Sequence, residues 1–206
     1  MDYGAANERI ERLSEIARAA PSLMQVLRTV RGLGLPEWLL MSGAVYQPVL
    51  NHLTGRPADY GIRDYDLGYF DASDISYDAE DSVIRRVAAA FEEPLRSVIE
   101  TRNQARVHLW FEAHFGEAYT PLSCTAEALE RFVAPMFAVG VRLDAEDRLH
   151  IQAPFGLADF SDCGCGQTRT GRLPGSTGLP LAWCNAGPSS RLSGYSAANK
   201  EGELDA

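Results

Sequence analysis

Two aspartates that flank a single residue, Asp64 and Asp66, are the first side chains whose types and spacing point to chemistry. They open a run of β-forming residues, and side chains two positions apart in a strand point to the same face. The oxygen atoms of converging carboxylates suit Mg2+ or Mn2+. A pair of such ions, roughly 3.5 to 4 Å apart, activates an attacking hydroxyl and stabilises the leaving oxygen in phosphoryl transfer. We therefore predict a metal site for phosphoryl transfer at this strand.

A third carboxylate and two arginines are further candidates. Glu100 belongs to a later expected strand, and neighbouring strands in a sheet are only about 4.8 Å apart. We therefore predict that Glu100 joins Asp64 and Asp66 as a metal ligand and catalytic acid. Arg102 would share the face of Glu100 and meet phosphate charge, and Arg106 is a second candidate for nucleotide binding. For both arginines a surface salt bridge remains the alternative, because such pairs are common.

The Ser42-Gly43 pair lies between an expected buried strand and an expected helix. A glycine at such a turn permits close backbone approach, and the exposed N-H groups of a helix start favour phosphate oxygens. We therefore predict that Ser42 and Gly43 bind the triphosphate of a nucleotide. Two other classes of site are excluded by their missing motifs, since neither a P-loop lysine nor the G-x-S-x-G elbow of serine hydrolases occurs.

The elements that must position these residues follow from hydrophobic periodicity. Helical patterns predict helices over residues 7–20, 22–31, 44–53, 79–91, 104–115 and 126–132. Apolar and β-branched runs predict strands over residues 38–41, 64–70, 97–102, 139–143 and 149–153. Asn103 is expected to cap the helix that follows it, while Tyr69, His108 and Trp110 are expected to pack against the sheet. This order predicts an α/β fold of the α+β kind, a mixed sheet flanked by helices.

The composition limits the class of protein. The chain has 206 residues, of which 46% are hydrophobic and 23% charged, as in a soluble globular protein. No stretch reaches the roughly 18 uninterrupted apolar residues of a spanning helix, so we expect no membrane partner and a cytoplasmic location. The formal net charge of -9 disfavours extended nucleic acid, whose binding depends on clustered Lys and Arg. A small nucleotide held by metal and a few arginines remains compatible.

The end of the chain differs in composition from the rest. Residues 1–162 carry the expected elements and are predicted to form one domain, whereas residues 163–206 are rich in Gly, Ser and Pro. We expect an irregular or disordered tail there. The four cysteines form no paired C-x-x-C motif, and we interpret them as incidental thiols: Cys124, Cys163, Cys165 and Cys184. A zinc site made by the three tail cysteines and a histidine is the alternative.

Several segments resemble the polymerase-beta-like nucleotidyltransferase superfamily, and more closely a bacterial, largely uncharacterised family of nucleotidyltransferase-like proteins within it. These segments are Ser42-Gly43-Ala44-Val45, Arg63-Asp64-Tyr65-Asp66, Tyr69-Phe70-Asp71, Arg102-Asn103-Gln104-Ala105-Arg106-Val107-His108-Leu109-Trp110, Val139-Gly140-Val141-Arg142-Leu143 and Ala153-Pro154-Phe155-Gly156-Leu157. The resemblance extends from Gly43 to about Phe160, which is more than half of the chain. Its most specific part is the Asn-Gln-Ala-Arg block, not the aspartate pair.

The resemblance implies a nucleotidyltransferase-type fold and metal-dependent nucleotidyl transfer, with Asp64, Asp66 and Glu100 as the acids. The chain departs from the superfamily pattern at Ala44, where a second Gly or Ser is usual, and in a longer interval between the glycine turn and Asp64. It departs again after Phe160, where relatives continue with an ordered end that contains Arg-Pro. The abrupt change motivates the hypothesis that the tail from about residue 163 is a replaced or frame-shifted terminus.

These observations predict a metal-dependent nucleotidyltransferase that moves a nucleoside monophosphate from a nucleoside triphosphate to a hydroxyl acceptor. A small molecule, a protein side chain and an RNA end are all compatible acceptors, and no residue chooses among them. The alternative is a catalytically inactive nucleotide-binding or regulatory module with the same fold. A third hypothesis, a structural interaction domain, predicts no metal-dependent binding.

Overall fold

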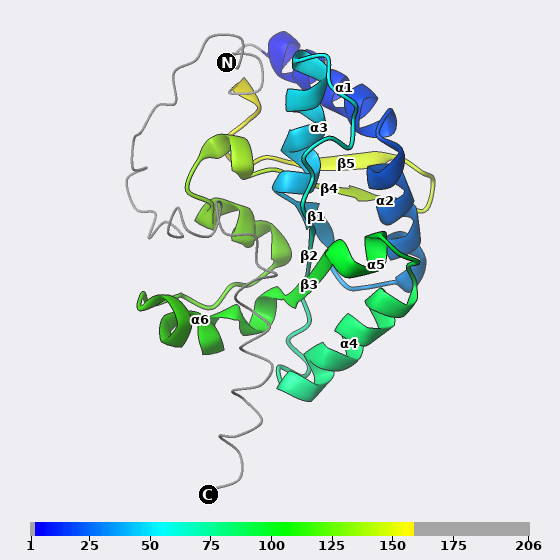
Figure 1. The fold of residues 1–206 in the computed structure, drawn as a ribbon. Coiled ribbons are helices and arrows are strands. Elements are labelled where there is room, and N and C mark those ends of the chain that lie inside the picture. The colour runs from blue at the N-terminus through cyan, green and yellow to red at the C-terminus, as the bar shows by residue number, and fades with distance from the viewer. Residues whose placement is uncertain (1–2, 159–206) are drawn as a thin grey trace, which may run out of the picture.

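The computed structural model describes residues 3–158 (Figure 1). The expected tail over residues 163–206, its three cysteines and the expected domain boundary at residue 162 lie outside this range. Within it, no helix combines the length and the apolar character that crossing a membrane requires.

A mixed five-stranded sheet forms the centre of the described residues, with the strand order β3-β2-β1-β4-β5. The strands are β1 (Leu39–Met41), β2 (Tyr65–Tyr69), β3 (Ile99–Asn103), β4 (Gly140–Leu143) and β5 (Leu149–Gln152). The pair β2 and β3 is parallel, and the other neighbouring strands are antiparallel. The predicted mixed sheet flanked by helices is therefore confirmed, and each predicted strand is present with ends that shift by at most two residues.

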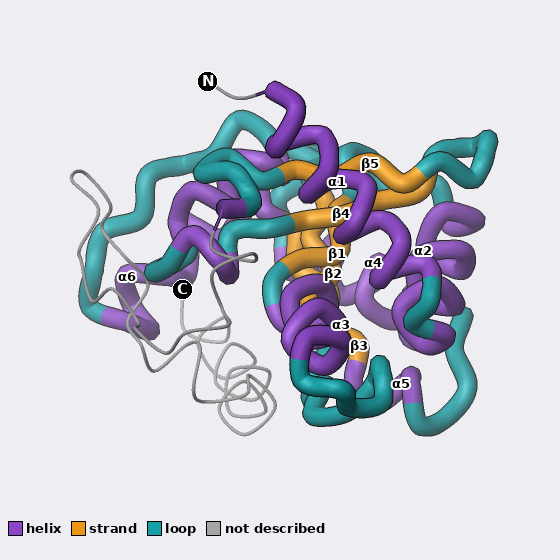
Figure 2. Tube along the Cα trace, turned by 90° about the horizontal axis from the view of Figure 1, so that it is seen from above, coloured by secondary structure: helices purple, strands orange, loops and turns teal. Residues whose placement is uncertain are grey.

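Helices cover both faces of the sheet. They are α1 (Tyr3–Arg18), α2 (Pro21–Leu33), α3 (Gly43–Leu53), α4 (Tyr77–Ala89), α5 (Leu95–Val98) and α6 (Val107–Phe115), with the 3-10 helices η1 (Gln104–Arg106), η2 (Thr125–Arg131) and η3 (Pro135–Phe137). Figures 1 and 2 show α1, α2 and α4 on one side of the sheet and α6 on the other. We call these sides the α2 face and the α6 face.

Several helices differ from the sequence-based expectation, among them η2 and α5, and η3 was not expected either. The segment expected as an α-helix over residues 126–132 is the 3-10 helix η2, whose buried Thr125 and Ala128 are three residues apart. Apolar spacing of three residues occurs in both helix types, so the pattern does not separate them. Helix α5 was not expected, because four residues are too few for a helical period to be visible.

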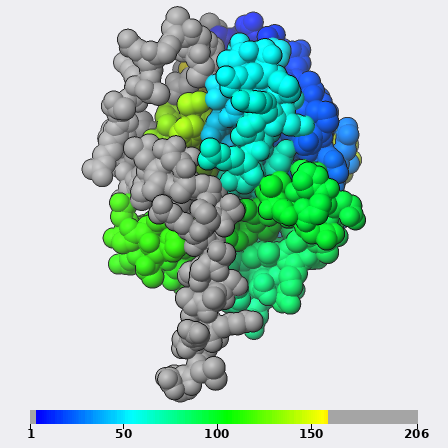
Figure 3. Space-filling view, viewed as in Figure 1, coloured from blue at the N-terminus to red at the C-terminus, as the bar shows by residue number. Residues whose placement is uncertain are grey.

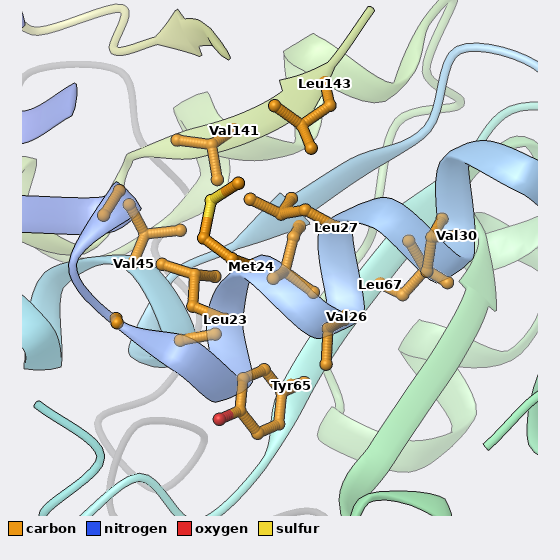
Figure 4. Close-up of a cluster of buried hydrophobic side chains, with 14 of the residues drawn as sticks. Leu23, Met24, Val26, Leu27, Val30, Val45, Tyr65, Leu67, Val141 and Leu143 are labelled. Carbon is orange, nitrogen blue, oxygen red and sulfur yellow. The ribbon is translucent and has the colours of Figure 1, made fainter. Parts of the chain in front are cut away.

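The strands place alternate residues in the hydrophobic cores on the two faces. On the α2 face, Leu23 and Leu27 of α2 pack with Tyr65 and Leu67 of β2 and with Val141 of β4 (Figure 4). Burial of each such aliphatic side chain stabilises the fold by about 1.5–3 kcal/mol.

A second core lies on the α6 face, where Leu39 and Met41 of β1 pack with Leu122, Leu129 and Phe132. Leu40, between the two β1 residues, belongs to the core on the α2 face. Because residues two apart share a face, the same rule places Asp66 and Gly68 of β2 on the α6 face.

Candidate functional site

The central aspartate of the candidate site is placed by the alternation along β2. Tyr65, Leu67 and Tyr69 are buried in the core on the α2 face, so Asp66 points to the α6 face. Asp64 immediately precedes β2 instead of lying inside it. The alternation alone therefore does not fix the direction of the Asp64 side chain, whose position is given by its contact with the start of α3.

The third acid is brought to Asp66 by the pairing of β2 with β3. In the parallel register Asp66 is the partner of Glu100, and Gly68 is the partner of Arg102. Side chains of paired residues point to the same face, so Glu100 and Arg102 lie on the face of Asp66. The sheet thus brings together three of the residues that the sequence singled out: Asp66, Glu100 and Arg102.

The start of α3 lies beside Asp64. Because β1 and β2 are antiparallel, the end of β1 is next to the beginning of β2, and the chain turns there through Ser42 into α3. A Cβ atom placed on Gly43 would lie 3.7 Å from Oδ1 of Asp64. The start of α3, where the helix dipole and the first N-H groups favour anions, therefore lies close to the Asp64 carboxylate. In the space-filling view α3 and the loop after it form part of the surface (Figure 3).

Ser42 holds this turn in an unusual backbone conformation. Its φ of 52° and ψ of -119° belong to a region that glycine adopts without cost and that other residues avoid. Such a conformation costs about 1–3 kcal/mol and is characteristic of sites where function requires it. The conformation is held by the Ser42 amide, which donates to the Val139 carbonyl at 2.9 Å, and by the Ser42 carbonyl, which accepts from the Val45 amide at 2.8 Å.

The carboxylates perturb one another. Burial, followed by the charges of Asp64 and Glu100, raises the pKa of Asp66 to about 8, and Arg102 opposes this rise. Burial raises the pKa of Asp64, against the opposing charge of Arg63. Burial also raises the pKa of Glu100, which Arg102 lowers and Asp64 raises. Three acids with raised pKa values in one place gain stability from any cation that binds them.

The donor set fits a hard divalent cation, but it does not form a complete cage. Carboxylate oxygens are the ligands of Mg2+ and Mn2+, and Mg2+ in nucleotide enzymes is held by one or two carboxylates together with substrate phosphates. Among residues 3–158 no group of three or more His, Cys, Asp or Glu side chains is arranged as a ready-made metal site. The remaining ligands would therefore come from a phosphate or from water.

Gly68 limits the space on the α6 face beyond Asp66. A Cβ atom on Gly68 would lie 2.7 Å from Cε of Met41 and 3.1 Å from Cγ2 of Thr125, so the sheet and η2 are closely packed there and a larger residue would displace these side chains. A Cβ atom on Gly43, by contrast, would have only Oδ1 of Asp64 within 4 Å, so there is more space on the side of Asp64 and the start of α3.

The two candidate arginines have different positions. Arg102 is half-buried beside Glu100, and its Nη1 donates to the Thr101 carbonyl at 2.8 Å. Arg106 is only 5% exposed, forms an ion pair with Glu80 of α4 and donates through Nε to the Ile75 carbonyl at 3.2 Å. Arg106 therefore forms the salt bridge that was its alternative role, but the pair is buried and not at the surface. Its guanidinium is used within the fold, so we leave Arg106 out of the nucleotide-binding residues.

Other residues near the site have the structural roles expected from the sequence. The Asn103 side chain accepts from the Ala105 amide at 3.1 Å, which confirms the expected cap. Tyr69 and Trp110 are buried, as expected for residues that pack against the sheet. Glu80 was not singled out, although it precedes the apolar stripe of α4 by one helical turn; an acidic residue in line with such a stripe is the signal that identifies a buried charge.

Comparison with known proteins gives two matches. A family model described as nucleotidyltransferase matches residues 28–172, a range that includes β1 to β5 and extends beyond the segment on which the resemblance rests. A structure solved by NMR, described as revealing a CCA-adding enzyme head domain, is 25% identical with a TM-score of 0.58. The match covers 73% of this chain and 74% of that one. No curated protein matches the chain significantly.

Proposed function

The chain belongs to the nucleotidyltransferase family, and from this premise we propose that it moves a nucleoside monophosphate from a nucleoside triphosphate to a hydroxyl acceptor with the help of Mg2+ or Mn2+. Asp64, Asp66 and Glu100 are the proposed metal ligands. Ser42 and Gly43, with Arg102, are the proposed triphosphate-binding residues. The observation that carries the proposal is the position of Asp64 beside the start of α3, within electrostatic reach of two further acids.

Each group has a distinct task in this reaction. The N-H groups at the start of α3 hold phosphate oxygens, and Arg102 balances negative charge on the same face of the sheet. A bound divalent cation supplies charge neutralisation at the phosphates when it is present. The acceptor hydroxyl gives its proton to water and its oxygen bonds to the α-phosphorus. The bond from the α-phosphorus to the oxygen that bridges to the β-phosphate breaks, and pyrophosphate leaves. Catalysis of this kind consists of positioning and charge stabilisation, which a preorganised set of carboxylates and amides provides.

The proposal is tested by calorimetric titration of nucleoside triphosphates with Mn2+, followed by assays of pyrophosphate release. Small alcohols, a serine-containing peptide and an RNA 3′ end are offered as acceptors. Asp66→Asn is expected to abolish turnover, and Asp78→Asn, an exposed aspartate on α4, is the matched control. Binding without turnover for every acceptor would support the inactive module, and absence of metal-dependent nucleotide binding would refute the proposal.

A further inference from the structure

The buried ion pair of Glu80 and Arg106 lies outside the proposed metal site, yet it is connected to the strand that carries Glu100. We propose that Glu80, Arg106 and Asn103 are positioning residues, which fix the register of β3 and thereby the place of Glu100 and Arg102. This inference rests on the proposed function for its catalytic meaning. Its structural part, the register of β3, is testable separately.

The contacts of Glu80 join α4 to the end of β3. Oε1 of Glu80 accepts from the Asn103 backbone amide at 2.8 Å, and Oε2 pairs with Nη1 of Arg106. The Arg106 guanidinium also lies over the ring of Tyr77, at 5.7 Å from the centroid, and donates to the Ile75 carbonyl. Each charge therefore has several partners in a site that excludes water, which is the condition under which a buried pair is rigid.

Asn103 joins the end of β3 to the end of β2. Its Oδ1 accepts from the Asp71 amide at 3.0 Å, and its Nδ2 donates to the Asp71 carbonyl at 2.8 Å. The same Oδ1 accepts from the Ala105 amide at the start of η1. Side chain and backbone of one residue thus hold two neighbouring strands and the following helix at fixed positions.

The register of β3 matters because this strand has only one neighbour in the described sheet, β2. A strand at a sheet edge lacks the second partner that would otherwise restrict sliding. Side chains alternate along a strand, so a shift by one residue would turn Glu100 and Arg102 to the opposite face and replace Glu100 by Thr101 beside Asp66. A link at the end of β3 that excludes this shift keeps the third acid with the other two.

Stability alone does not account for such a pair. Replacement of a buried ion pair by apolar side chains of similar size is often neutral or stabilising, whereas removal of one partner leaves a buried charge and destabilises. A role in positioning therefore predicts that stability and metal affinity respond differently to substitution. A role in stability alone predicts that they change together.

The deciding variant is Glu80→Met combined with Arg106→Met in the full chain. We expect it to fold with a Tm no lower than that of Glu80→Gln, although the Asn103 amide loses its acceptor, because no buried charge is left unpaired. We also expect faster exchange of the amide hydrogens of residues 99–103 and about 10- to 100-fold weaker Mn2+ binding, the loss that follows removal of residues that support metal ligands. The single variant Glu80→Gln keeps an acceptor for the Asn103 amide but leaves Arg106 without a counter-charge. It is expected to lower Tm and to retain more Mn2+ affinity than the double variant.

The matched control is Asp81→Asn with Arg85→Gln, which removes an ion pair of 2.6 Å between an exposed arginine and a half-buried aspartate on the same helix. We expect this control to change neither hydrogen exchange in β3 nor Mn2+ affinity. Native hydrogen exchange and native Mn2+ affinity in the double Met variant would overturn the inference. If the unaltered protein binds no Mn2+, the proposed function fails, and hydrogen exchange in β3 still decides whether the pair fixes the register.

Discussion

Asp66→Asn should change the pH dependence of stability in a way that measures the cost of ionising Asp66, which is buried beside Asp64 and Glu100. The pKa of Asp66 rises from 3.8 to about 8 in the folded protein. The stability that the preference for a protonated Asp66 gives the folded protein is fully present below about pH 3.8. It is lost as the pH rises through about 8, because ionisation of this carboxyl is more costly in the folded state than in the unfolded state. Asparagine has no such ionisation. The variant should therefore become more stable relative to the native protein as the pH increases.

The magnitude follows from the same values. The difference between 3.8 and about 8 sets an upper limit of about 6 kcal/mol. Asp66 retains some contact with solvent, and Arg102 remains beside it, so we expect about 1–3 kcal/mol. With an m value of about 2 kcal/mol per molar in urea, this corresponds to a relative shift of the midpoint of about 0.5–1.5 M.

The assay is urea unfolding of both proteins at pH 5 and at pH 8.5, with a chelator to remove divalent cations. Added Mg2+ should stabilise the native protein at pH 8.5 and have little effect on Asp66→Asn. Asp78→Asn should show the native pH dependence, since Asp78 is exposed on α4. Parallel curves for the native protein and Asp66→Asn across this pH range would refute the reasoning that burial and the neighbouring carboxylates raise the pKa of Asp66.

Three further predictions concern the same site. Ser42→Gly should raise stability by about 1–2 kcal/mol in thermal unfolding, because it relieves the unfavourable φ. It should also weaken triphosphate binding in calorimetry, and an equal affinity would count against Ser42 as a triphosphate-binding residue. Gly43→Ala should leave stability unchanged or raise it by up to about 1 kcal/mol, because alanine favours the helical conformation of α3. The added Cβ, 3.7 Å from Oδ1 of Asp64, should weaken nucleotide binding, and unchanged binding would argue against a phosphate at the helix start. Mn2+ affinity, measured by electron paramagnetic resonance, should rise between pH 6 and pH 8.5, because protons compete with the metal for Asp66, whose pKa is raised to about 8. An affinity independent of pH would contradict the proposal that Asp66 is a metal ligand.

The sequence was sufficient for features that depend on local periodicity. The alternation of apolar residues in β2 predicted the face of Asp66, and β1 showed the same period in its burial. The sequence also placed a glycine turn at the start of α3. Such features depend on two or three adjacent residues, because the backbone geometry of a strand fixes the direction of each side chain relative to its neighbours.

Features that depend on distant pairing could not be derived in the same way. The register that makes Glu100 the partner of Asp66 arises from contacts between strands more than thirty residues apart in the chain. Arg106 illustrates the limit most clearly, because its partner Glu80 lies on another helix. An arginine in the sequence is equally compatible with a buried ion pair, a surface ion pair and a phosphate ligand. The position of Asp64 also depends on a segment distant in the sequence, the turn at the end of β1.

The cations beside the acids, Arg63 and Arg102, are both arginines, and this has a consequence for the shape of a pH profile. A guanidinium group stays protonated throughout the range in which a protein remains folded. Nucleotide binding that loses strength only by protonation of carboxylates gives a sigmoid that reaches a plateau on the alkaline side. A bell-shaped curve would reveal an additional ionising group among the participants, supplied by the acceptor or by another part of the chain.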